Sequence, residues 1–356
     1  MVNNYENTAE ALMRLFKYEG KEPFNFYKGQ KQIFKAIVLK TPKRLHVVTP
    51  TQYGKKISDD TPILTSNGWK FHGDLKIGDY VFSHNGKQVK VLNIFNDGVD
   101  VDREIEFTNG EKIKCHKNHE WLVAFKDWSR SKTPYRILET KQIENNKRLK
   151  EFSLSNIKPL DYKEVKLPID PYTFGAWLGD GTTGEPVFNN SIEDYAIREK
   201  IPYKVSSESK HKKTGVITYR YYGQNLKYFK EVGKKHIPKE YLQAAIHQRL
   251  ELLAGLIDTD GSVNKTIRKN GDRNGRVYIV NSNKQLIDDI CELIQGLGMR
   301  VSITKVKAKL STSGIQGKKD IYYVGFQPFI NIPTAIERKK IIPLEKEIAS
   351  FFSSLF

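Results

Sequence analysis

Two stretches of the chain share a pattern that could carry acid chemistry, because each ends in an aspartate followed by glycine. The stretch "TFGAWLGDG" (173–181) aligns without gaps with "LAGLIDTDG" (253–261), and the alignment places Asp180 opposite Asp260. An apolar run with small residues that closes on glycine predicts a buried helix with a glycine at its C-terminal end. The repeat therefore predicts two similar helices, each with a carboxylate at its C-terminal end.

Small residues at matched positions of the repeat predict that the two helices lie side by side. Gly175 matches Gly255, and small residues of this kind let helix backbones approach closely. The carboxylates of Asp180 and Asp260 would then lie together at the negative ends of two helix dipoles, where they repel each other. A divalent cation relieves that repulsion, and paired carboxylates holding Mg²⁺ or Mn²⁺ beside a phosphodiester are the components of metal-assisted hydrolysis. A single stretch is explained equally well by an ordinary buried helix; the pair favours the metal site.

The second stretch differs at one residue from the motif that gives the LAGLIDADG homing endonucleases their name, and the first resembles that family's drifted partner motif. The resemblance implies an α+β chain in which residues 166–356 form two pseudo-symmetric αββαββα units. It also implies a monomer that cuts both strands of double-stranded DNA at a specific site. In that family Asp180 and Asp260 would be catalytic ligands of Mg²⁺ (or Mn²⁺).

A second repeated element follows each Asp-Gly pair. The stretches "KHIP" (235–238) and "KIIP" (340–343) share the pattern Lys-x-Ile-Pro. In the dodecapeptide subgroup of the family a lysine in this setting assists each active site, so the resemblance assigns catalytic roles to Lys235 and Lys340. An exposed lysine before a turn would give the same pattern. Because so short a match can slip by one residue, two neighbours remain alternatives: Lys234 and Lys339.

Basic residues gather in two segments with strand character. The segment "NKTIRKNGDRNGRVYIV" (264–280) predicts a hairpin with Asn-Gly turns, and "RVSITKVKAK" (300–309) places lysines at every second position of a strand. Solvated edge strands that resist aggregation would also be basic. Below paired carboxylates, a basic curved sheet is better explained as a surface that contacts DNA backbone and base edges. The predicted DNA-binding residues are Lys265, Arg268, Lys269, Arg273, Arg276, Lys305, Lys307 and Lys309.

The composition fits a DNA-binding chain of several domains. The 356 residues suffice for two or three domains, and the net charge of +18 favours a polyanionic partner. The apolar runs are too short for a membrane span and the first residues lack the pattern of a signal peptide, so a cytoplasmic location is predicted. Cys115 and Cys291 are too few for a disulfide framework or a cysteine zinc site.

The beginning of the chain resembles an ATP site that is interrupted. The stretch "RLHVVTPTQYGK" (44–55) predicts a strand and a phosphate-binding loop that ends at Gly54 and Lys55, but Lys56 follows where serine or threonine is required. This part resembles a P-loop ATPase of the terminase or helicase kind. The next part, "ISDDTPILTSNGW" and hairpins at Asn-Gly turns, resembles the start of an intein (Hint) domain inserted into that loop. The resemblance predicts a prokaryotic, viral or phage protein with three domains: an ATPase fragment (N-extein-like) at 1–55, a β-rich, incomplete Hint-like domain at 56–165, and an endonuclease domain at 166–356.

The Hint-like part lacks groups that protein splicing needs. An intein begins with cysteine or serine, whose side chain attacks the preceding carbonyl, and Lys56 cannot form that ester. In "HKNH" (116–119) His119 matches the histidine of the Thr-x-x-His motif, but His116 stands in place of the threonine. No His-Asn pair follows Asn331, and the chain is expected to leave no room for closing strands. Splicing is therefore predicted to be incomplete and His119 to be a packed residue.

Three alternatives to an endonuclease remain open. The chain would be an intein that still splices or cleaves if a partner chain supplied the C-terminal strands. It would be a DNA-binding remnant if catalysis were lost. A nucleotide-driven motor is disfavoured, because the loop lacks its hydroxyl residue and no acidic metal-binding strand follows.

Overall fold

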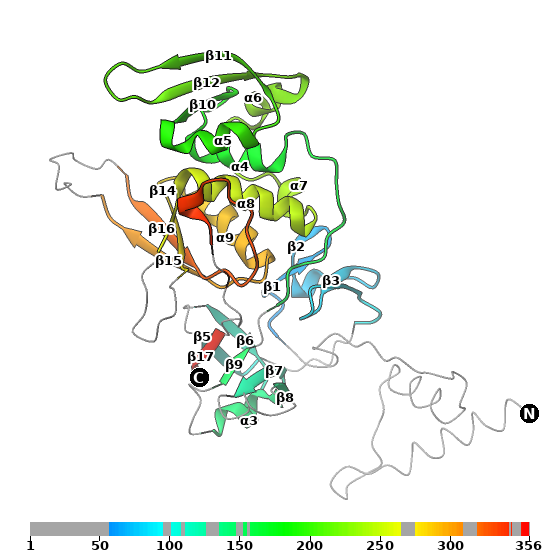
Figure 1. Cartoon of the computed structure of the whole chain (residues 1–356). Helices are drawn as coiled ribbons and strands as arrows, with labels where there is room; N and C mark the ends of the chain where they lie inside the picture. The colour runs from blue at the N-terminus through cyan, green and yellow to red at the C-terminus, as the bar shows by residue number, and fades with distance from the viewer. Residues whose placement is uncertain are drawn as a thin grey trace, which may run out of the picture.

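The computed structural model describes residues 57–94, 101–107, 111–125, 135–146, 152–154, 157–264, 275–308, 319–341, 343 and 350–355 (Figure 1). The predicted ATPase fragment at 1–55 lies outside these residues. So do the following predicted site residues: Gly54, Lys55, Lys56, Lys265, Arg268, Lys269, Arg273 and Lys309.

A sheet that we call the middle sheet is built from the central part of the chain and its last strand. Strand β7 alternates buried and half-buried residues along its length, as a strand with one face on a core does. The buried face includes Val123, which packs with Ile105 and Phe152, and helix α3 (Thr140–Glu144) follows β8 and buries Ile143 there. The strand order is β6-β5-β17-β9-β7-β8. The strands are β5 (Arg103–Phe107), β6 (Lys112–Cys115), β7 (Glu120–Phe125), β8 (Tyr135–Glu139), β9 (Phe152–Leu154) and β17 (Ser350–Leu355).

The last strand corrects two predictions about the end of the chain. Strand β17 lies between β5 and β9 and is antiparallel to both, with Phe352 opposite Phe107 and Ser350 opposite Leu154. Residues 350–355 thus belong to the middle sheet and not to the domain predicted at 166–356. The prediction that no closing strand follows Lys340 is also wrong, because β17 covers backbone edges of β5 and β9 that would otherwise be unpaired.

A smaller meander, the hairpin sheet, lies against the helical part of the molecule (Figure 1). The predicted hairpin around Asn85-Gly86 is confirmed. Strands β3 and β4 are antiparallel, with Phe82 opposite Gln88, and Gly86 has a φ of +79° that suits glycine. Segment 157–162 joins this sheet to helix α9, since Asp161 N donates to Gly86 O and Leu160 N donates to Gly296 O, both at 2.8 Å. The sheet has the order β2-β1-β3-β4, with β1 (Pro62–Thr65), β2 (Gly68–Phe71), β3 (Tyr80–Phe82) and β4 (Gln88–Lys90), and the 3₁₀ turn η1 (His72–Asp74) follows β2.

The described residues between 171 and 341 form an α/β body whose two halves each begin with one of the Asp-Gly helices. In the first half (171–242) the sheet order is β10-β12-β11, and in the second half (246–341) it is β13-β14-β16-β15. The elements of the first half are α4 (Pro171–Asp180), β10 (Val187–Asn190), η4 (Ile192–Asp194), α5 (Tyr195–Lys200), β11 (Lys204–Lys210), β12 (Ile217–Tyr222), η5 (Gln224–Lys227), α6 (Tyr228–Val232) and α7 (Lys239–Leu242). Those of the second half are α8 (Ile246–Asp260), β13 (Gly261–Val263), β14 (Val277–Asn281), α9 (Lys284–Gly296), β15 (Val301–Val306), β16 (Ile321–Phe326) and η6 (Glu337–Lys339).

The halves differ in the strand that follows the motif helix. In the second half β13 pairs with β14 over Gly261–Val263. In the first half the same place holds a single bridge between Gly181 and Phe188. Both halves share one apolar core, in which aromatic rings of the first half stack, Phe174 on Tyr241 at 4.3 Å and Trp177 on Phe229 at 4.8 Å. None of the helices in the described part of the chain is long and apolar enough to cross a membrane.

Candidate active site

The two Asp-Gly helices, α4 and α8, lie in backbone contact because glycines face each other (Figure 1). A Cβ atom at Gly175 would lie 2.0 Å from Leu252 O, and one at Gly255 would lie 2.2 Å from Tyr172 O. Any side chain at either position would push the helices apart. The close approach predicted from the small residues is therefore present.

Both helices end where the predicted carboxylates stand. Helix α4 begins at Pro171 behind Asp170, whose carboxylate accepts hydrogen bonds from Thr173 N at 2.9 Å and Thr173 Oγ1 at 2.8 Å. Helices α4 and α8 end at Asp180 and Asp260, each followed by a glycine in extended conformation. The first of these glycines is required by close packing and not by its φ, since a Cβ at Gly181 would lie 2.1 Å from Trp177 Cδ1.

The carboxylate of Asp260 lies close enough to Asp180 to raise the pKa of Asp180. The carboxyl carbon of Asp260 is 3.4 Å from the Cβ position of Gly179, the residue before Asp180. Burial, and next the charge of Asp260, raise the pKa of Asp180 to about 6. Burial also raises the pKa of Asp260, against a hydrogen bond of 3.2 Å that Asn281 Nδ2 donates to it. The structure thus brings together the two residues that the repeat predicted to meet.

Lys235 lies at the same site. Its Nζ donates a 2.7 Å hydrogen bond to the carbonyl of Gly179 and lies 5.6 Å from the centroid of the Trp177 ring. Burial lowers the pKa of this ammonium, and the charges of Asp260 and Asp180 act in the opposite direction. Lys235 therefore occupies the position expected of a group that assists chemistry at the paired carboxylates.

The predicted partner, Lys340, does not reach the site and is replaced there by Lys339. The Lys340 side chain is 59% exposed and pairs with Glu337. Lys339 Nζ donates to the carbonyls of Ile257, Asp258 and Thr259 at 3.0, 2.7 and 2.9 Å, so it lies at the C-terminal end of α8. Burial lowers its pKa.

The packing of the two segments explains why the prediction of Lys340 is wrong by one residue. Ile237 and Ile341 are the buried residues that anchor the two segments, at 3% and 7% exposure. Each stands two residues after the lysine that reaches the helix end, so the structural repeat is Lys-x-Ile. The proline of the second segment comes one residue later than in the first, and aligning the prolines selected the wrong lysine.

The carboxylate pair fits a divalent cation. Among the residues that the structure describes, no cluster of three or more His, Cys, Asp or Glu side chains could hold a metal. Mg²⁺, however, is commonly held by one or two carboxylates and completes its shell with water and substrate phosphate. Two partly desolvated carboxylates with raised pKa values present hard oxygen ligands at a place where a cation would remove their repulsion.

One predicted DNA-binding residue, Arg276, lies on the face of the second-half sheet that is turned away from the helices. Val324 of β16 is fully buried beneath the other face. Its neighbour Gly325 pairs with Tyr278 and with Ser302, so these two side chains lie on the face opposite to Val324. Arg276 donates to Ser302 Oγ and lies 5.5 Å from the centroid of the Tyr278 ring.

Lys305, another predicted DNA-binding residue, lies on the opposite face of this sheet. Lys305 pairs with Asp320 at 2.8 Å and lies 5.8 Å from the centroid of the Tyr322 ring. Lys284 of α9 lies 5.9 Å from the same ring, so Tyr322 and Lys305 share the helix-covered face. Lys307 lies near enough to Asp320 to contribute to the lowered pKa of that carboxyl. Lys305 and Arg276 therefore lie on opposite faces of the second-half sheet.

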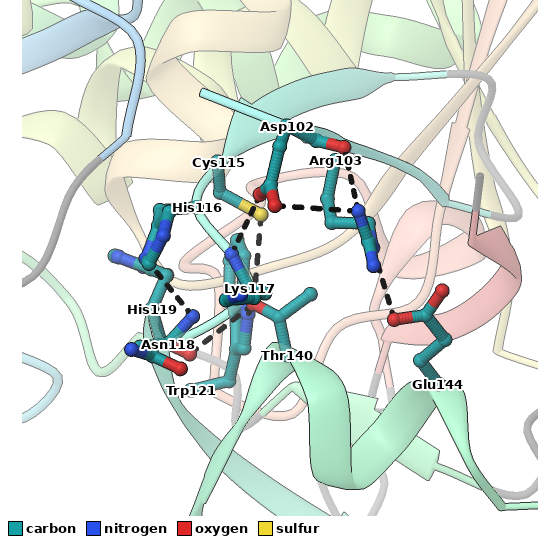
Figure 2. Close-up of polar contacts among 10 residues, drawn as sticks. All are labelled: Asp102, Arg103, Cys115, His116, Lys117, Asn118, His119, Trp121, Thr140 and Glu144. Atoms are coloured by element: carbon teal, nitrogen blue, oxygen red, sulfur yellow. Dashed lines mark hydrogen bonds and ion pairs between the residues drawn. The ribbon is translucent and has the colours of Figure 1, made fainter. Parts of the chain in front are cut away.

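Of the splicing-like residues, the structure describes His119, which lies directly before β7 of the middle sheet (Figure 2). His119 is buried and its ring lies edge-on to Trp121 at 4.5 Å. Thr140 N donates to His119 O at 2.8 Å, and Trp121 Nε1 donates to Thr140 Oγ1 at 2.9 Å. The Sγ atom of Cys115 lies 3.5 Å from Thr140 Oγ1. The backbone of Cys115 also forms a β-bridge with Ile57, the residue after Lys56. His119 is thus packed, as predicted, and Thr140 contacts both His119 and Cys115, the bridge partner of Ile57.

Residues 247–325 match the family model described as a LAGLIDADG-like domain. The chain carries a LAGLIDADG-like domain. The match runs from α8 into β16 and includes Asp260, whereas Asp180 and Lys339 lie outside it. The motif resemblance noted in the sequence is therefore confirmed for the second half.

Known proteins are similar to longer parts of the chain. The chain is 31% identical over 287 residues to the replicative DNA helicase DnaB of Mycobacterium intracellulare, a match that covers 74% of this chain and 46% of that protein. The expected relation to a helicase is thereby confirmed, although the chain spans less than half of that relative's length. Among solved structures, I-DmoI in complex with DNA and Mn covers 45% of this chain and 89% of its own, with 17% identity and a TM-score of 0.30. The MchDnaB-1 intein covers 28% of this chain and 66% of its own, with 22% identity and a TM-score of 0.22.

The sequence held signals for two site residues that were not predicted. Asp258 is a second acid inside the LAGLIDADG-like motif, and its carboxylate is buried away from those of Asp180 and Asp260. Asn281, at the end of β14, follows the predicted basic hairpin directly in the chain and donates to Asp260. The position of Asn281 depends on strand pairing across the sheet, which the sequence pattern does not specify.

Proposed function

We propose that the chain is a site-specific DNA endonuclease that cuts both strands of a duplex with a divalent metal ion, Mg²⁺ or Mn²⁺. The observation that carries the proposal is the meeting of Asp180 and Asp260 at the ends of two helices in backbone contact, with a lysine at each end. The LAGLIDADG-like match and the net charge of +18 support it.

Each residue of the site has a proposed role in phosphodiester hydrolysis. Asp180 and Asp260 hold the metal ion, which when bound polarises a phosphate oxygen and lowers the pKa of water. The ammonium groups of Lys235 and Lys339 place positive charge where the phosphate gains negative charge in the transition state. Asn281 orients the Asp260 carboxylate through its hydrogen bond.

The duplex is proposed to lie along the sheet faces that are turned away from the helices. In the second half this face presents Arg276 and Tyr278, and the predicted basic residues of segment 265–273 adjoin it in the chain. In the first half β12 turns Arg220 and Tyr222 outward between buried tyrosines. Arginines and aromatic side chains on such a surface contact phosphates and bases.

The setting of the nuclease is proposed from the DnaB relative. Residues 56–356 are an intein-like element, inserted after Lys55 in a DnaB-type helicase of the prokaryotic cytoplasm, and the nuclease acts as a monomer. Its target is then the uninterrupted helicase gene.

The test uses the purified chain and tiled duplexes that span a DnaB-type helicase gene without an insertion. We expect one duplex to be cut in both strands with Mg²⁺ or Mn²⁺, and cutting to stop with EDTA. Asp180→Asn together with Asp260→Asn should abolish cutting while near-ultraviolet circular dichroism stays unchanged, and Lys340→Ala should cut normally. Undiminished cutting by the double variant would overturn the metal assignment, and salt-sensitive binding without any cutting would show a DNA-binding remnant.

A second candidate function, self-cleavage at the start of the Hint-like segment, is favoured by the register of the middle sheet. Ile57 pairs with Cys115 at the end of β6, and Leu355 of β17 lies opposite Ile105 of the neighbouring strand β5. Ile57 and strand β17 therefore approach the same part of a single sheet, an arrangement that suits protein splicing. Because residue 56 is lysine, we expect the chain with its own sequence not to cleave itself at this position. Lys56→Cys should release residues 1–55 in the presence of a thiol, seen by mass spectrometry, and an intact Lys56→Cys chain would exclude this function.

A further inference from the structure

The two lysines of the proposed site are carried by short segments without regular strands, and something must fix each segment against the helix ends. Lys235 lies between α6 and α7, and Lys339 ends the 3₁₀ turn η6. A lysine side chain has many rotamers, so its ammonium is placed only if the backbone around it is held. The anchors of the two segments are therefore part of the site.

The Lys235 segment is fastened by α9, which belongs to the other half of the body. Asp289 is buried in α9, and its Oδ2 accepts a 2.8 Å hydrogen bond from the backbone N of Ile237. Gln285 Nε2 donates to the other carboxylate oxygen at 2.8 Å. Asn283 Nδ2 donates to the carbonyl of Lys235 itself at 2.6 Å. The backbone from the carbonyl of Lys235 to the N–H of Ile237 is thus held by α9 and its N-cap residue Asn283.

The Lys339 segment is fastened by a second buried carboxylate, that of Asp258 in α8. Its Oδ2 accepts from Ala335 N at 2.6 Å and its Oδ1 accepts from Ile336 N at 3.3 Å. The Tyr172 hydroxyl, from α4 in the first half, donates to Oδ2 at 2.7 Å and keeps that carboxylate in place. A charge-assisted bond to backbone N–H is among the stronger anchors available to a loop.

The first half also contacts the Lys339 segment directly. Lys200 of α5 donates to the carbonyl of Pro333, pairs with Glu251 at 2.8 Å, and lies 4.2 Å from the centroid of the Tyr172 ring. Arg338, the residue before Lys339, pairs with Asp194 of the first half at 2.5 Å. Each lysine segment is therefore tied to the half from which it does not come.

We propose that Asp289 and Asp258 are positioning residues: Asp289 fixes Lys235 and Asp258 fixes Lys339, each through backbone N–H groups of the lysine's segment. The proposal rests on the proposed nuclease function for its kinetic consequence. Asp289 touches no reacting atom; its loss frees the Lys235 segment while the metal ligands stay where they are. A misplacement of about 1 Å costs about a hundredfold in rate, so the strand served by Lys235 is cut more slowly and the substrate accumulates as a nicked duplex.

The first experiment measures the lysines without any cutting. In protein labelled with ¹³C at lysine, the Cε–Hε signals of Lys235 and Lys339 are assigned with Lys235→Arg and Lys339→Arg. We expect Asp289→Ala to move the Lys235 signal to the position of a solvated lysine and to leave the Lys339 signal in place, and Asp258→Ala to do the reverse. Asp289→Asn keeps an oxygen that accepts from Ile237 N, so it should restore the Lys235 signal. An unchanged Lys235 signal in folded Asp289→Ala would overturn the proposal.

The matched control is Asp288, the neighbour of Asp289 in the same helix. Its side chain is half exposed and pairs with Lys284 on the helix surface, so Asp288→Ala should move neither lysine signal. Movement equal to that of Asp289→Ala would show a general effect of α9 and would also overturn the proposal.

The second experiment follows both strands of the cut duplex, each with its own end label. We expect Asp289→Ala to slow, about tenfold to a hundredfold, the same strand that Lys235→Met slows, and Asp258→Ala to slow the strand that depends on Lys339. Asp289→Asn should cut both strands at nearly the normal rate. Equal slowing of both strands by Asp289→Ala would contradict the assignment. If the unmodified chain cuts no duplex, the nuclease proposal fails alone, because the lysine signals still decide whether the aspartates position the lysines.

Discussion

The two halves of the α/β body carry the same motif but hold their lysines in different ways. Lys235 gives one of its three ammonium protons to the carbonyl of Gly179, whereas Lys339 donates to three carbonyls at the end of α8. The LAGLIDADG-like motif has Asp258 as its buried anchor, and the matching position of the first motif is Leu178. The first half therefore depends on a carboxylate from α9. The two lysines therefore lie at matching places but are held by different residues.

This difference predicts a division of work between the lysines. Lys235 keeps donors that can reach a phosphate oxygen, so its main contribution should be to rate. Lys339 neutralises the carbonyl end of α8, where a cation near the negative end of the helix dipole stabilises the fold.

The largest effect should come from the helix contact, in which the halves are alike. Gly255→Ala would place Cβ 2.2 Å from Tyr172 O and 2.6 Å from Ala176 N, and Gly175→Ala would place it 2.0 Å from Leu252 O. Since backbone atoms cannot rotate away, we expect each variant to lose about 3 kcal/mol or more and to lower Tm by about 10 °C, with loss of cutting. Calorimetry measures this. Gly223→Ala, whose nearest atom is 3.3 Å away, is the control, and a normal Tm for Gly255→Ala would contradict the close packing of α4 and α8.

The second effect concerns the carboxylates of Asp180 and Asp260, whose charges repel each other when no cation is bound. Asp180→Asn and Asp260→Asn should each slow cutting about a thousandfold, which corresponds to about 4 kcal/mol of transition-state stabilisation. Burial raises the pKa of Asp180 from 3.8 to about 6, so the folded chain binds this proton more tightly than the unfolded chain does. The stability contribution of Asp180 therefore rises as pH falls from 6 towards 3.8 and is lost above pH 6.

Substitution of the same carboxylates should lower the rate of cutting but raise the stability of the metal-free protein. In metal-free protein at about pH 7, Asp180→Asn removes a desolvated charge and should raise Tm by on the order of 3 °C. Scanning calorimetry with EDTA, at about pH 5 and about pH 7, measures this difference. A lower Tm for Asp180→Asn at the higher pH would mean that the carboxylate is stabilised in the fold and is not poised for a cation.

The third effect separates the lysines. Lys339→Met removes a donor from the carbonyls of Ile257, Asp258 and Thr259, of which Ile257 O keeps the hydrogen bond from Gly261 N, and we expect a loss of stability of about 1–3 kcal/mol. Lys235→Met should lose less stability but slow one strand about tenfold to a hundredfold. Lys340→Met should change neither, because its ammonium is exposed beside Glu337. Urea titration and strand-resolved cutting are the measurements, and identical profiles for Lys235→Met and Lys339→Met would remove the distinction between the halves.

The sequence was sufficient for the features that depend on local pattern. Matched glycines and a terminal aspartate in each stretch determine which faces of α4 and α8 meet, and the structure agrees. The register of Lys339 was not predictable, because buried Ile341 sets it and proline spacing suggests otherwise. The place of β17 was not predictable either, since its partners β5 and β9 lie far away in the chain and pairing over such a separation leaves no local signal.

Period-two spacing also has a limit that Lys305 illustrates. It predicts which residues of a strand share a face but not which face the helices cover. In the second-half sheet the helices cover the face of Lys305, as the position of Lys284 beside Tyr322 shows. Only the pairing of β15 with β16 and their packing on α9 reveal this.

The smallest effect compares the two faces of that sheet. Arg276→Ala removes a cation from the face turned away from the helices, so we expect weaker duplex binding and a salt slope reduced by about 1. Lys305→Ala removes a cation from the face beside α9, where it pairs with Asp320, and should leave both quantities unchanged. Fluorescence anisotropy with the target duplex, between about 50 and 200 mM salt, measures affinity and slope together. A reduced slope for Lys305→Ala with a normal slope for Arg276→Ala would place the duplex on the helix-covered side and reverse the assignment of the two faces.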